Sequence, residues 1–297
     1  MFQKVSRQRP CEICGKSDWC TYSNTYSLCR RTNTGHGKEK SDRNGDAYWV
    51  YRNGDSPASN CHQSRSNVPK RPLKCIQASS VVNQEITQIL GLEKAHWGNL
   101  YNRGLRDEHI IQGEYRSINP QTLNLLLGKL SGKYPVETLL KVPGFWKDQD
   151  QKIRASQIFG MMIPVRDVKG RITAFKVRRD NVPQGENRFL LFSHKNGVSA
   201  GNELHIPIFS SENHDVIRVT EGELKADIAT VLSSVKTIGI PGVSSWRSAI
   251  PFIKEYNYKR ALLAFDSDIY DNKNVARAFV EAYENLKKII KVEIEKW

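Results

Sequence analysis

Three acidic residues follow two short apolar runs in the C-terminal third of the chain. Glu221 closes the run 216–220, and Asp266 and Asp268 follow the run 261–265. Aliphatic runs of this length, bounded by a glycine or an acidic cluster, are typical of strands buried in a parallel sheet. The apolar residues after Glu221 recur at helical spacing, which predicts a helix between the two strands and therefore a βαβ unit.

The predicted βαβ unit brings the three carboxylates together. Open α/β sheets bind ligands in the crevice at the carboxyl edge of their strands, and there Glu221, Asp266 and Asp268 would repel one another. A hard cation such as Mg²⁺ or Mn²⁺ removes the repulsion and prefers carboxylates together with water and phosphate oxygens. An isolated Asp-x-Asp is usually a turn or a helix cap. The combination predicts metal-assisted phosphoryl transfer or phosphodiester cleavage.

A second set of metal ligands lies near the N-terminus. Cys11, Cys14, Cys20 and Cys29 fall within 20 residues. The first two have zinc-knuckle spacing, because two thiolates three residues apart can hold one ion while the following glycine allows the tight turn. The group predicts a structural Zn²⁺ site. The residues themselves leave other ligands open for the second pair, namely His36, Cys61 and His62.

The composition indicates the class of partner. The chain has 297 residues, 39% of them hydrophobic, six cysteines and a formal charge of +14. Such a charge predicts a polyanionic partner, either nucleic acid or an anionic membrane surface. No apolar run approaches the roughly 20 residues of a membrane span, and the N-terminus lacks a signal-peptide core. We therefore expect a cytoplasmic protein without a membrane-spanning segment, in which cysteines serve as metal ligands rather than disulfide partners.

Four segments are predicted along the chain. Residues 1–52 form the zinc module, whose last strand interleaves aromatic and basic residues that can stack bases or supply a small core. Residues 53–80 are rich in Ser, Asn, Pro and basic residues and are predicted to be a flexible linker. Residues 81–213 form a helical hairpin and a β-rich subdomain, and residues 214–297 form the α/β sheet.

The β-rich segment carries basic residues on a predicted strand. Alternation over 171–179 places Lys176 and Arg178 on one face, with Arg179 at the edge. A charged strand face is most often simply solvated. Here, however, the strand follows an apolar run and a turn at Lys169 and Gly170, so it is expected to pair as a hairpin.

The order of these motifs resembles the TOPRIM domain shared by bacterial-type DNA primases, topoisomerases and some nucleases. The resemblance covers 215–297 and implies that Glu221 is the metal-positioning or general acid and that Asp266 and Asp268 are the metal pair. Primases of the main bacterial lineage usually carry a further acid where this chain has Lys225. The Glu-Gly-Glu-x-Lys-Ala-Asp form is similar to primase-like proteins of plasmids and phages, in which a lysine is usual and is expected to contact phosphate.

The resemblance extends upstream of that domain. Cys-x-Ile-Cys-Gly-Lys-x-Asp-Trp-Cys, followed by Leu-Cys-Arg-Arg, is similar to the zinc ribbon that opens plasmid and phage primases, which favours the four cysteines between residues 11 and 29. The pattern over 162–172 resembles the basic subdomain that precedes TOPRIM, which by resemblance holds template and nucleoside triphosphates. Each phosphate neutralised there strengthens binding in a salt-dependent way. The implied nucleic-acid and nucleotide contacts are Lys176, Arg178, Arg179, Arg188 and Lys225.

We therefore predict a DNA primase or close relative, built from a zinc ribbon, a mixed α+β basic subdomain and a TOPRIM α/β domain. It would make short primers on single-stranded DNA by metal-dependent nucleotidyl transfer, with a replicative helicase as a partner. No helicase domain is recognisable, so we expect a catalytic core or a piece of a longer protein. Two alternatives stay open, namely a TOPRIM nuclease and a non-catalytic primase-like DNA-binding or loader protein of a mobile element.

Overall fold

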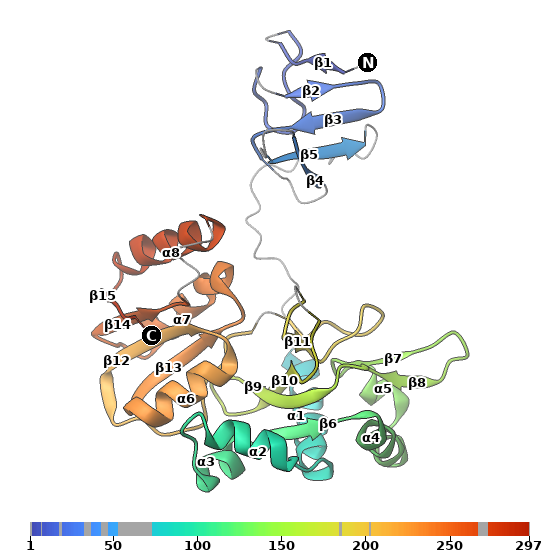
Figure 1. Ribbon diagram of the computed structural model, residues 1–297, viewed down its shortest axis with the longest axis vertical. Helices are drawn as coiled ribbons and strands as arrows, with labels where there is room; N and C mark the ends of the chain where they lie inside the picture. The colour runs from blue at the N-terminus through green and yellow to red at the C-terminus, as the bar shows by residue number, and fades with distance from the viewer. Residues whose placement is uncertain are drawn as a thin grey trace. The chain divides into compact units, whose positions relative to one another are not determined.

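The protein divides into two compact units, Met1–Asn67 and Val68–Trp297. The computed structural model, drawn in Figure 1, describes residues 2–6, 8–17, 20–32, 37–42, 47–52, 73–183, 186–201, 203–266 and 273–296. Each unit has hydrophobic clusters of its own. Among the helices described, none combines the length and the apolar character needed to cross a bilayer.

The first unit is a small antiparallel sheet with strand order β1-β2-β3-β5-β4. Its core is so small that three cysteines, Cys11, Cys20 and Cys29, make up most of it, together with Val5 and Tyr51. A module with so few buried apolar groups gains much of its stability from a metal. The strands are β1 (Gln3–Lys4), β2 (Thr21–Tyr22), β3 (Tyr26–Cys29), β4 (Lys38–Ser41) and β5 (Ala47–Arg52).

The second unit opens with helix α1 (Leu73–Ile89). This start corrects the predicted linker, which was expected to extend to residue 80. Half of the residues in 73–80 are polar, which favoured a linker, but Ser79 is fully buried, and its hydroxyl donates to the carbonyl of Ile76 at 3.1 Å. Further along, Asn83 Nδ2 donates to the carbonyl of Ile172 at 2.9 Å and so ties the helix to the sheet beneath it.

An antiparallel sheet with strand order β11-β10-β9-β6 forms the centre of this unit. Strands β9 (Gly160–Arg166) and β10 (Ile172–Arg179) pair as the predicted hairpin. Strand β6 (Arg116–Ile118) and strand β11 (Phe189–Leu191) flank them. A separate hairpin is formed by β7 (Phe145–Lys147) and β8 (Ile153–Ala155).

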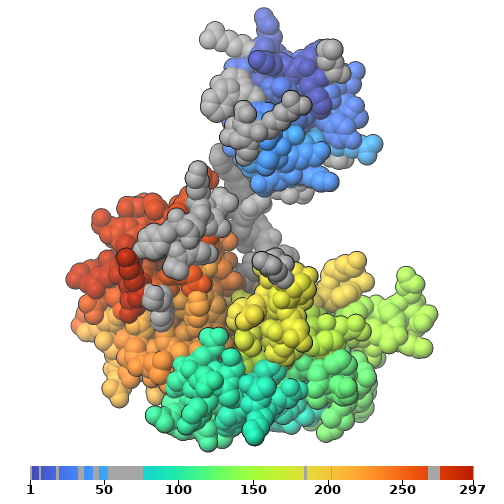
Figure 2. Space-filling model, viewed as in Figure 1, coloured from blue at the N-terminus to red at the C-terminus, as the bar shows by residue number. Residues whose placement is uncertain are grey.

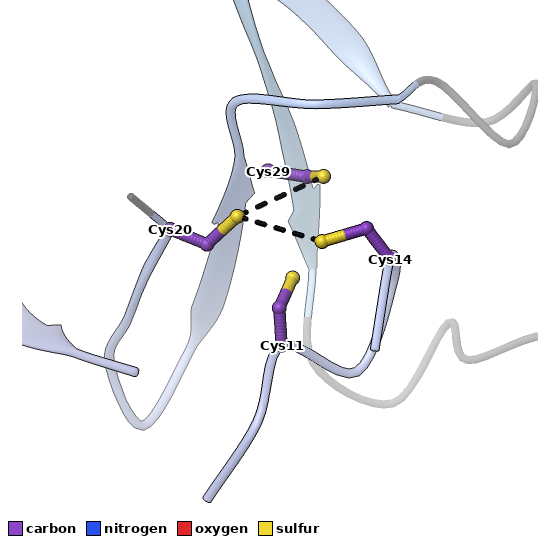
Figure 3. Close-up of side chains that lie close together, drawn as sticks. All are labelled: Cys11, Cys14, Cys20 and Cys29. Carbon is purple, nitrogen blue, oxygen red and sulfur yellow. Dashed lines mark hydrogen bonds between the residues drawn. The ribbon is translucent and has the colours of Figure 1, made fainter. Parts of the chain in front are cut away.

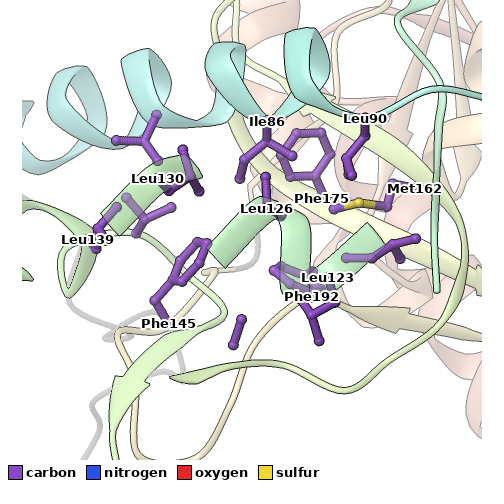
Figure 4. Packing of buried hydrophobic residues seen from close by; sticks show 14 of the residues in the cluster. Ile86, Leu90, Leu123, Leu126, Leu130, Leu139, Phe145, Met162, Phe175 and Phe192 are labelled. Atoms are coloured by element: carbon purple, nitrogen blue, oxygen red, sulfur yellow. The ribbon is translucent and has the colours of Figure 1, made fainter. Parts of the chain in front are cut away.

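Helices cover one face of this central sheet. Apolar residues of α1, α4 (Pro120–Lys133) and α5 (Val136–Leu139) pack on Met162 and Phe175, as Figure 4 shows. Helix α4 begins where it does because Asn119 Oδ1 accepts the backbone N–H of Thr122 at 2.9 Å and a proline occupies the first turn.

The opposite face of the central sheet packs on helix α6 (Glu223–Ser233). Met161 and Ile163 of β9 contact Leu224 of α6, together with residues of α2 (Lys94–Tyr101) and α3 (Asp107–Gly113). In Figure 2 the surface of α6 borders that of α2 and α3. Helix α6 therefore lies between the central sheet and the C-terminal sheet and fixes one relative to the other.

The C-terminal sheet is parallel, as predicted, with strand order β13-β12-β14-β15. Ile217 and Val219 of β12 face η1, α7 and α8, whereas Arg218 faces α6 and donates to Ser233 Oγ at 2.7 Å. Trp246 is buried in this core. The elements are β12 (Asn213–Glu221), β13 (Val235–Ile240), η1 (Val243–Ser248), α7 (Ala249–Glu255), β14 (Arg260–Ala264), α8 (Lys273–Leu286) and β15 (Lys291–Ile294).

Candidate active site and metal centre

Two of the three predicted acids lie at neighbouring strand ends. Glu221 is the last residue of β12, and Asp266 comes two residues after β14 ends. These strands are parallel neighbours, with Thr220 opposite Ala264. The chain leaves β12 towards β13 and leaves β14 in the other direction towards β15, so this is the topological switch point where open sheets bind ligands. Asp268 falls outside the described residues.

Gly222 makes the tight turn from β12 into α6. Its φ is +81°, in the left-handed region that favours glycine. Its N–H donates to the carbonyl of Ile240 at 2.9 Å, and its carbonyl accepts the N–H of Ala226 at 3.3 Å. A glycine therefore follows Glu221 because the chain must turn at once there if α6 is to begin beside Glu221.

Two lysines are paired with acids at this edge. Lys176 Nζ lies 2.9 Å from a carboxylate oxygen of Glu223, and both side chains are largely buried. Lys176 belongs to the central sheet and Glu223 begins α6. The ion pair therefore joins the central sheet to the helix that packs on the C-terminal sheet. The second pair joins Lys225 Nζ and Asp266 Oδ1, both partly exposed. Lys225, for which a phosphate contact was predicted, therefore contacts the predicted metal ligand.

Glu223 is a residue that the sequence analysis did not single out. It is only 3% exposed, and its carboxylate would be costly to bury without the ammonium group of Lys176. The sequence feature that could have identified Glu223 is the second acid of Glu-Gly-Glu. Its partner could not be read from the sequence, because Lys176 precedes it by 47 residues.

Asp227 does not belong to this edge. It is buried, and Asp227 Oδ2 accepts the hydroxyl of Tyr115 at 2.7 Å. His205 Nδ1 accepts the backbone N–H of Arg166 at 3.1 Å, so Nε2 carries the proton donated to Asp227 Oδ1 at 3.0 Å. Burial and the charge of Asp227 raise the pKa of Tyr115 well above its usual value. This network joins α6 to the central subdomain.

Arg178 occupies a cationic cluster on the same face of β10 as Lys176. The pairing of Lys176 with Ile163 and of Arg178 with Met161 confirms that the two share one face. Burial lowers the pKa of Arg178, and the nearby charges of Arg188 and Arg103 lower it further, while Asp180 opposes them. The Asp180 carboxylate lies 3.9 Å from Arg178 Nη1.

The cluster is suited to an anion. Within the described residues, the buried Nε of Arg178 has no hydrogen-bond partner. Three guanidinium groups in one region repel one another. A phosphate held by bidentate contacts relieves that repulsion, because its negative charge offsets their positive charges. Arg103 was missed by the sequence analysis, in which the segment was interpreted only as a helical hairpin.

The remaining predicted basic residue, Arg179, lies differently. Its Nη1 is 2.8 Å from Glu186 Oε2 and donates to the carbonyl of Asn187 at 3.2 Å. Its backbone N–H donates to the carbonyl of Arg188 at 2.9 Å. Arg179 therefore supports the approach of the chain to β11, whereas Arg188 is exposed and contributes to the field around Arg178.

Four cysteines of the first unit converge on one point, as Figure 3 shows. Their sulfur atoms all lie within 4.8 Å of one another. Cys14 Sγ is 3.7 Å from Cys20 Sγ, and Cys20 Sγ is 4.0 Å from Cys29 Sγ. Tetrahedral zinc with Zn–S bonds of about 2.3 Å separates its sulfurs by about 3.8 Å. The set Cys11, Cys14, Cys20 and Cys29 therefore fits a structural zinc site.

The protonation of these thiols also suits a metal. Burial raises the pKa of Cys20 and of Cys29. For Cys14, burial also acts upwards, but the backbone N–H of Lys16 and the neighbouring thiols prevail and lower its pKa. Thiolates are costly here without a counter-charge, which a divalent cation supplies when bound. The alternative ligands His36, Cys61 and His62 lie outside the described residues.

No family model and no curated protein matches the sequence. The structure resembles the zinc-binding and RNA polymerase domains of the Aquifex aeolicus primase, with a TM-score of 0.60, 12% identity and coverage of 77% of this chain and 57% of that chain. The chain thus spans little more than half the length of that relative.

Two further structures agree. The DnaG primase catalytic domain bound to single-stranded DNA gives a TM-score of 0.58, with 14% identity and coverage of 76% of this chain and 75% of that chain. A DNA primase domain from Pseudomonas aeruginosa gives a TM-score of 0.54, with 19% identity and coverage of 74% of this chain and 71% of that chain.

The fold is therefore that of bacterial DnaG-type primase catalytic domains, including their TOPRIM α/β domain. This confirms the predicted fold class and the predicted resemblance to bacterial-type primases. At these identities the likeness establishes the fold. The closer relation to primase-like proteins of plasmids and phages stays a prediction.

Proposed function

We propose that this protein is a DNA primase, a DNA-directed nucleotidyltransferase that makes short primers on single-stranded DNA from nucleoside triphosphates. The observation that carries the proposal is that the basic strand face of the central sheet lies next to the acidic edge of the C-terminal sheet. Glu221 and Asp266 end neighbouring strands, and Lys176 binds the first residue of α6 at that edge. Arg178 lies two residues further along the same strand face, about 7 Å away.

The acids would hold the metal. Carboxylate oxygens are the donors that Mg²⁺ and Mn²⁺ prefer, and we assign Glu221, Asp266 and Asp268 to this role. When bound, the divalent ion would neutralise charge on the triphosphate and favour attack by the primer 3′-oxygen. Glu221 would complete the site or accept a proton from the attacking hydroxyl.

The basic residues would hold the polyanions. Arg178, Arg188 and Arg103 form a cluster whose mutual repulsion decreases when phosphate binds. Lys176 would keep the first turn of α6, and with it Glu221, fixed relative to this cluster. Arg179 would contribute through the conformation of the segment that carries Arg188.

The zinc module would help to retain the template. Two arginines lie over tyrosine rings of its sheet, with Arg9 4.0 Å from the ring centre of Tyr22 and Arg30 5.4 Å from that of Tyr48. Arg30 also pairs with Asp42. Neighbouring cations and aromatic rings suit phosphates and bases. A replicative helicase is the partner that this function implies.

The experiment is primer synthesis on single-stranded DNA with labelled nucleotides and Mg²⁺ or Mn²⁺. We expect short products from the wild type and none from an Asp266→Ala, Asp268→Ala variant. The control Asp215→Asn, at the amino end of β12 in an exposed pair with Lys259, should retain activity. Cut template in place of primers would favour a nuclease. Intact, bound template without products would favour a loader protein.

A further inference from the structure

We propose that Lys225 acts as a fixed cation on Asp266 and competes with the divalent ion for that carboxylate. The inference rests on the proposed function, because that function requires a divalent ion at this edge. It assigns to Lys225 a role different from the phosphate contact that the sequence predicts.

The position of Lys225 follows from the backbone. Gly222 turns the chain so that α6 begins at Glu223, and Lys225 therefore stands in the first turn, beside the end of β14. There its ammonium group pairs with the carboxylate of Asp266. The two side chains are 46% and 39% exposed, so both can reach solvent and an approaching ion.

The other acids of the edge make this pairing consequential. Of the three described carboxylates, Glu223 is engaged by Lys176 in a buried pair and Asp266 by Lys225. The buried pair holds Lys176 in place, whereas the more exposed pair of Lys225 and Asp266 can open to an approaching ion. A divalent ion that binds Asp266 has to displace Lys225 or bind beside its positive charge.

The test measures Mn²⁺ binding to the zinc-loaded full chain from the spectrum of free Mn²⁺ in electron paramagnetic resonance. We expect the wild type to bind one ion that is lost in Asp266→Asn. Lys225→Ala should lower the Kd of this ion about tenfold, which is the order of effect expected from removing a unit charge near a partly exposed site. Lys225→Asp, which replaces the cation by a further carboxylate, should tighten Mn²⁺ binding more than Lys225→Ala does.

The matched control is Lys259→Ala. Lys259 also pairs with an aspartate on this sheet, Asp215, with Nζ 2.9 Å from Oδ2, but at the amino ends of the strands. Its removal should leave Mn²⁺ binding unchanged. Lys225→Gln keeps most of the side chain and gives the same answer if the alanine variant is unstable.

Two results would overturn the inference. They are wild-type affinity in Lys225→Ala and a gain in affinity that persists in Lys225→Ala with Asp266→Asn. The binding measurement is independent of primer synthesis. Tighter Mn²⁺ binding in Lys225→Ala without any primers would contradict the proposed function alone, whereas primers together with unchanged Mn²⁺ affinity in Lys225→Ala would contradict this inference alone.

Discussion

The two candidate metal sites of this protein are built in opposite ways. Four thiols from one short stretch close around a point in the first unit, and Cys11, Cys20 and Cys29 are buried. At the sheet edge, Glu221 and Asp266 come from strands 45 residues apart, and Lys225 already contacts one of them. A closed thiolate tetrahedron leaves no position for substrate and stabilises structure. An open set of oxygens leaves room for water and phosphate, as catalysis requires.

The largest effect separates the two sites by function. Asp266→Asn removes the charge of a proposed metal ligand while keeping the shape of the side chain. We expect primer synthesis to fall by at least about 100-fold, since a bound cation contributes several kcal/mol to phosphoryl transfer. Zinc content, measured by atomic absorption, should stay at the wild-type value. Loss of zinc from this variant would show that the two sites are not independent.

The converse change is Cys20→Ser. Cys20 is fully buried and its sulfur contacts those of Cys14 and Cys29, so we expect zinc content to fall from about one ion per chain to near zero. The small core of the first unit should then unfold, seen as faster hydrogen exchange in residues 1–52. Exchange in 73–296 should not change. A variant that keeps zinc would point to ligands outside the four cysteines.

A smaller effect concerns the arginines beside the open site. Arg178→Ala should weaken binding of single-stranded DNA and lower the slope of log affinity against log salt by about one unit. Arg178→Lys should restore most of the slope but less of the affinity, because lysine lacks the bidentate fork. Fluorescence anisotropy at several salt concentrations measures both.

The matched comparison is Arg179→Ala, the next residue along β10. Because Arg179 is engaged by Glu186, we expect a change in salt slope well below that of Arg178→Ala. Equal slopes for the two variants would contradict the assignment of Arg178 to phosphate binding.

The smallest effect comes from an acid with a permanent cation partner, outside both metal sites. Glu114 Oε2 lies 2.5 Å from Arg166 Nη2, which is almost completely buried. Burial acts to raise the pKa of Glu114, but the hydrogen bond and charge of Arg166 prevail and lower it. We expect Glu114→Gln to reduce the free energy of unfolding by about 1–3 kcal/mol at pH 7, after allowing for partial exposure of the carboxylate.

The pH dependence of this change has a definite sign. Because the pKa of Glu114 is lower in the folded state, its contribution is present above the unfolded pKa of about 4.3 and is lost as the pH falls through the folded value. The free energies of unfolding of Glu114→Gln and of the wild type, measured with urea, should therefore converge in acid. Asp215→Asn, in an exposed pair, should cost under about 0.5 kcal/mol at any pH. A cost for Glu114→Gln that persists in acid would contradict the ion-pair explanation.

Much of this architecture was predictable from local patterns. Buried parallel strands, the β9–β10 hairpin and the clustered cysteines each depend on residues close together in the chain. The start of α1 was not predictable in this way, because half of the residues in 73–80 are polar and one of them, Ser79, is buried. Arg103 was also missed, since its relation to Arg178 exists only after α2 packs on the central sheet.

The sequence by itself determined which chemical groups this protein carries and at which ends of its strands they stand. Periodicity, glycine at the turn after Glu221 and cysteine spacing are local properties, and local sterics and hydrophobicity suffice to interpret them. Only the tertiary structure decided the partners. It paired Lys176 with Glu223 and Lys225 with Asp266, because charges far apart in sequence acquire an interaction energy only when folding brings them within a few ångströms.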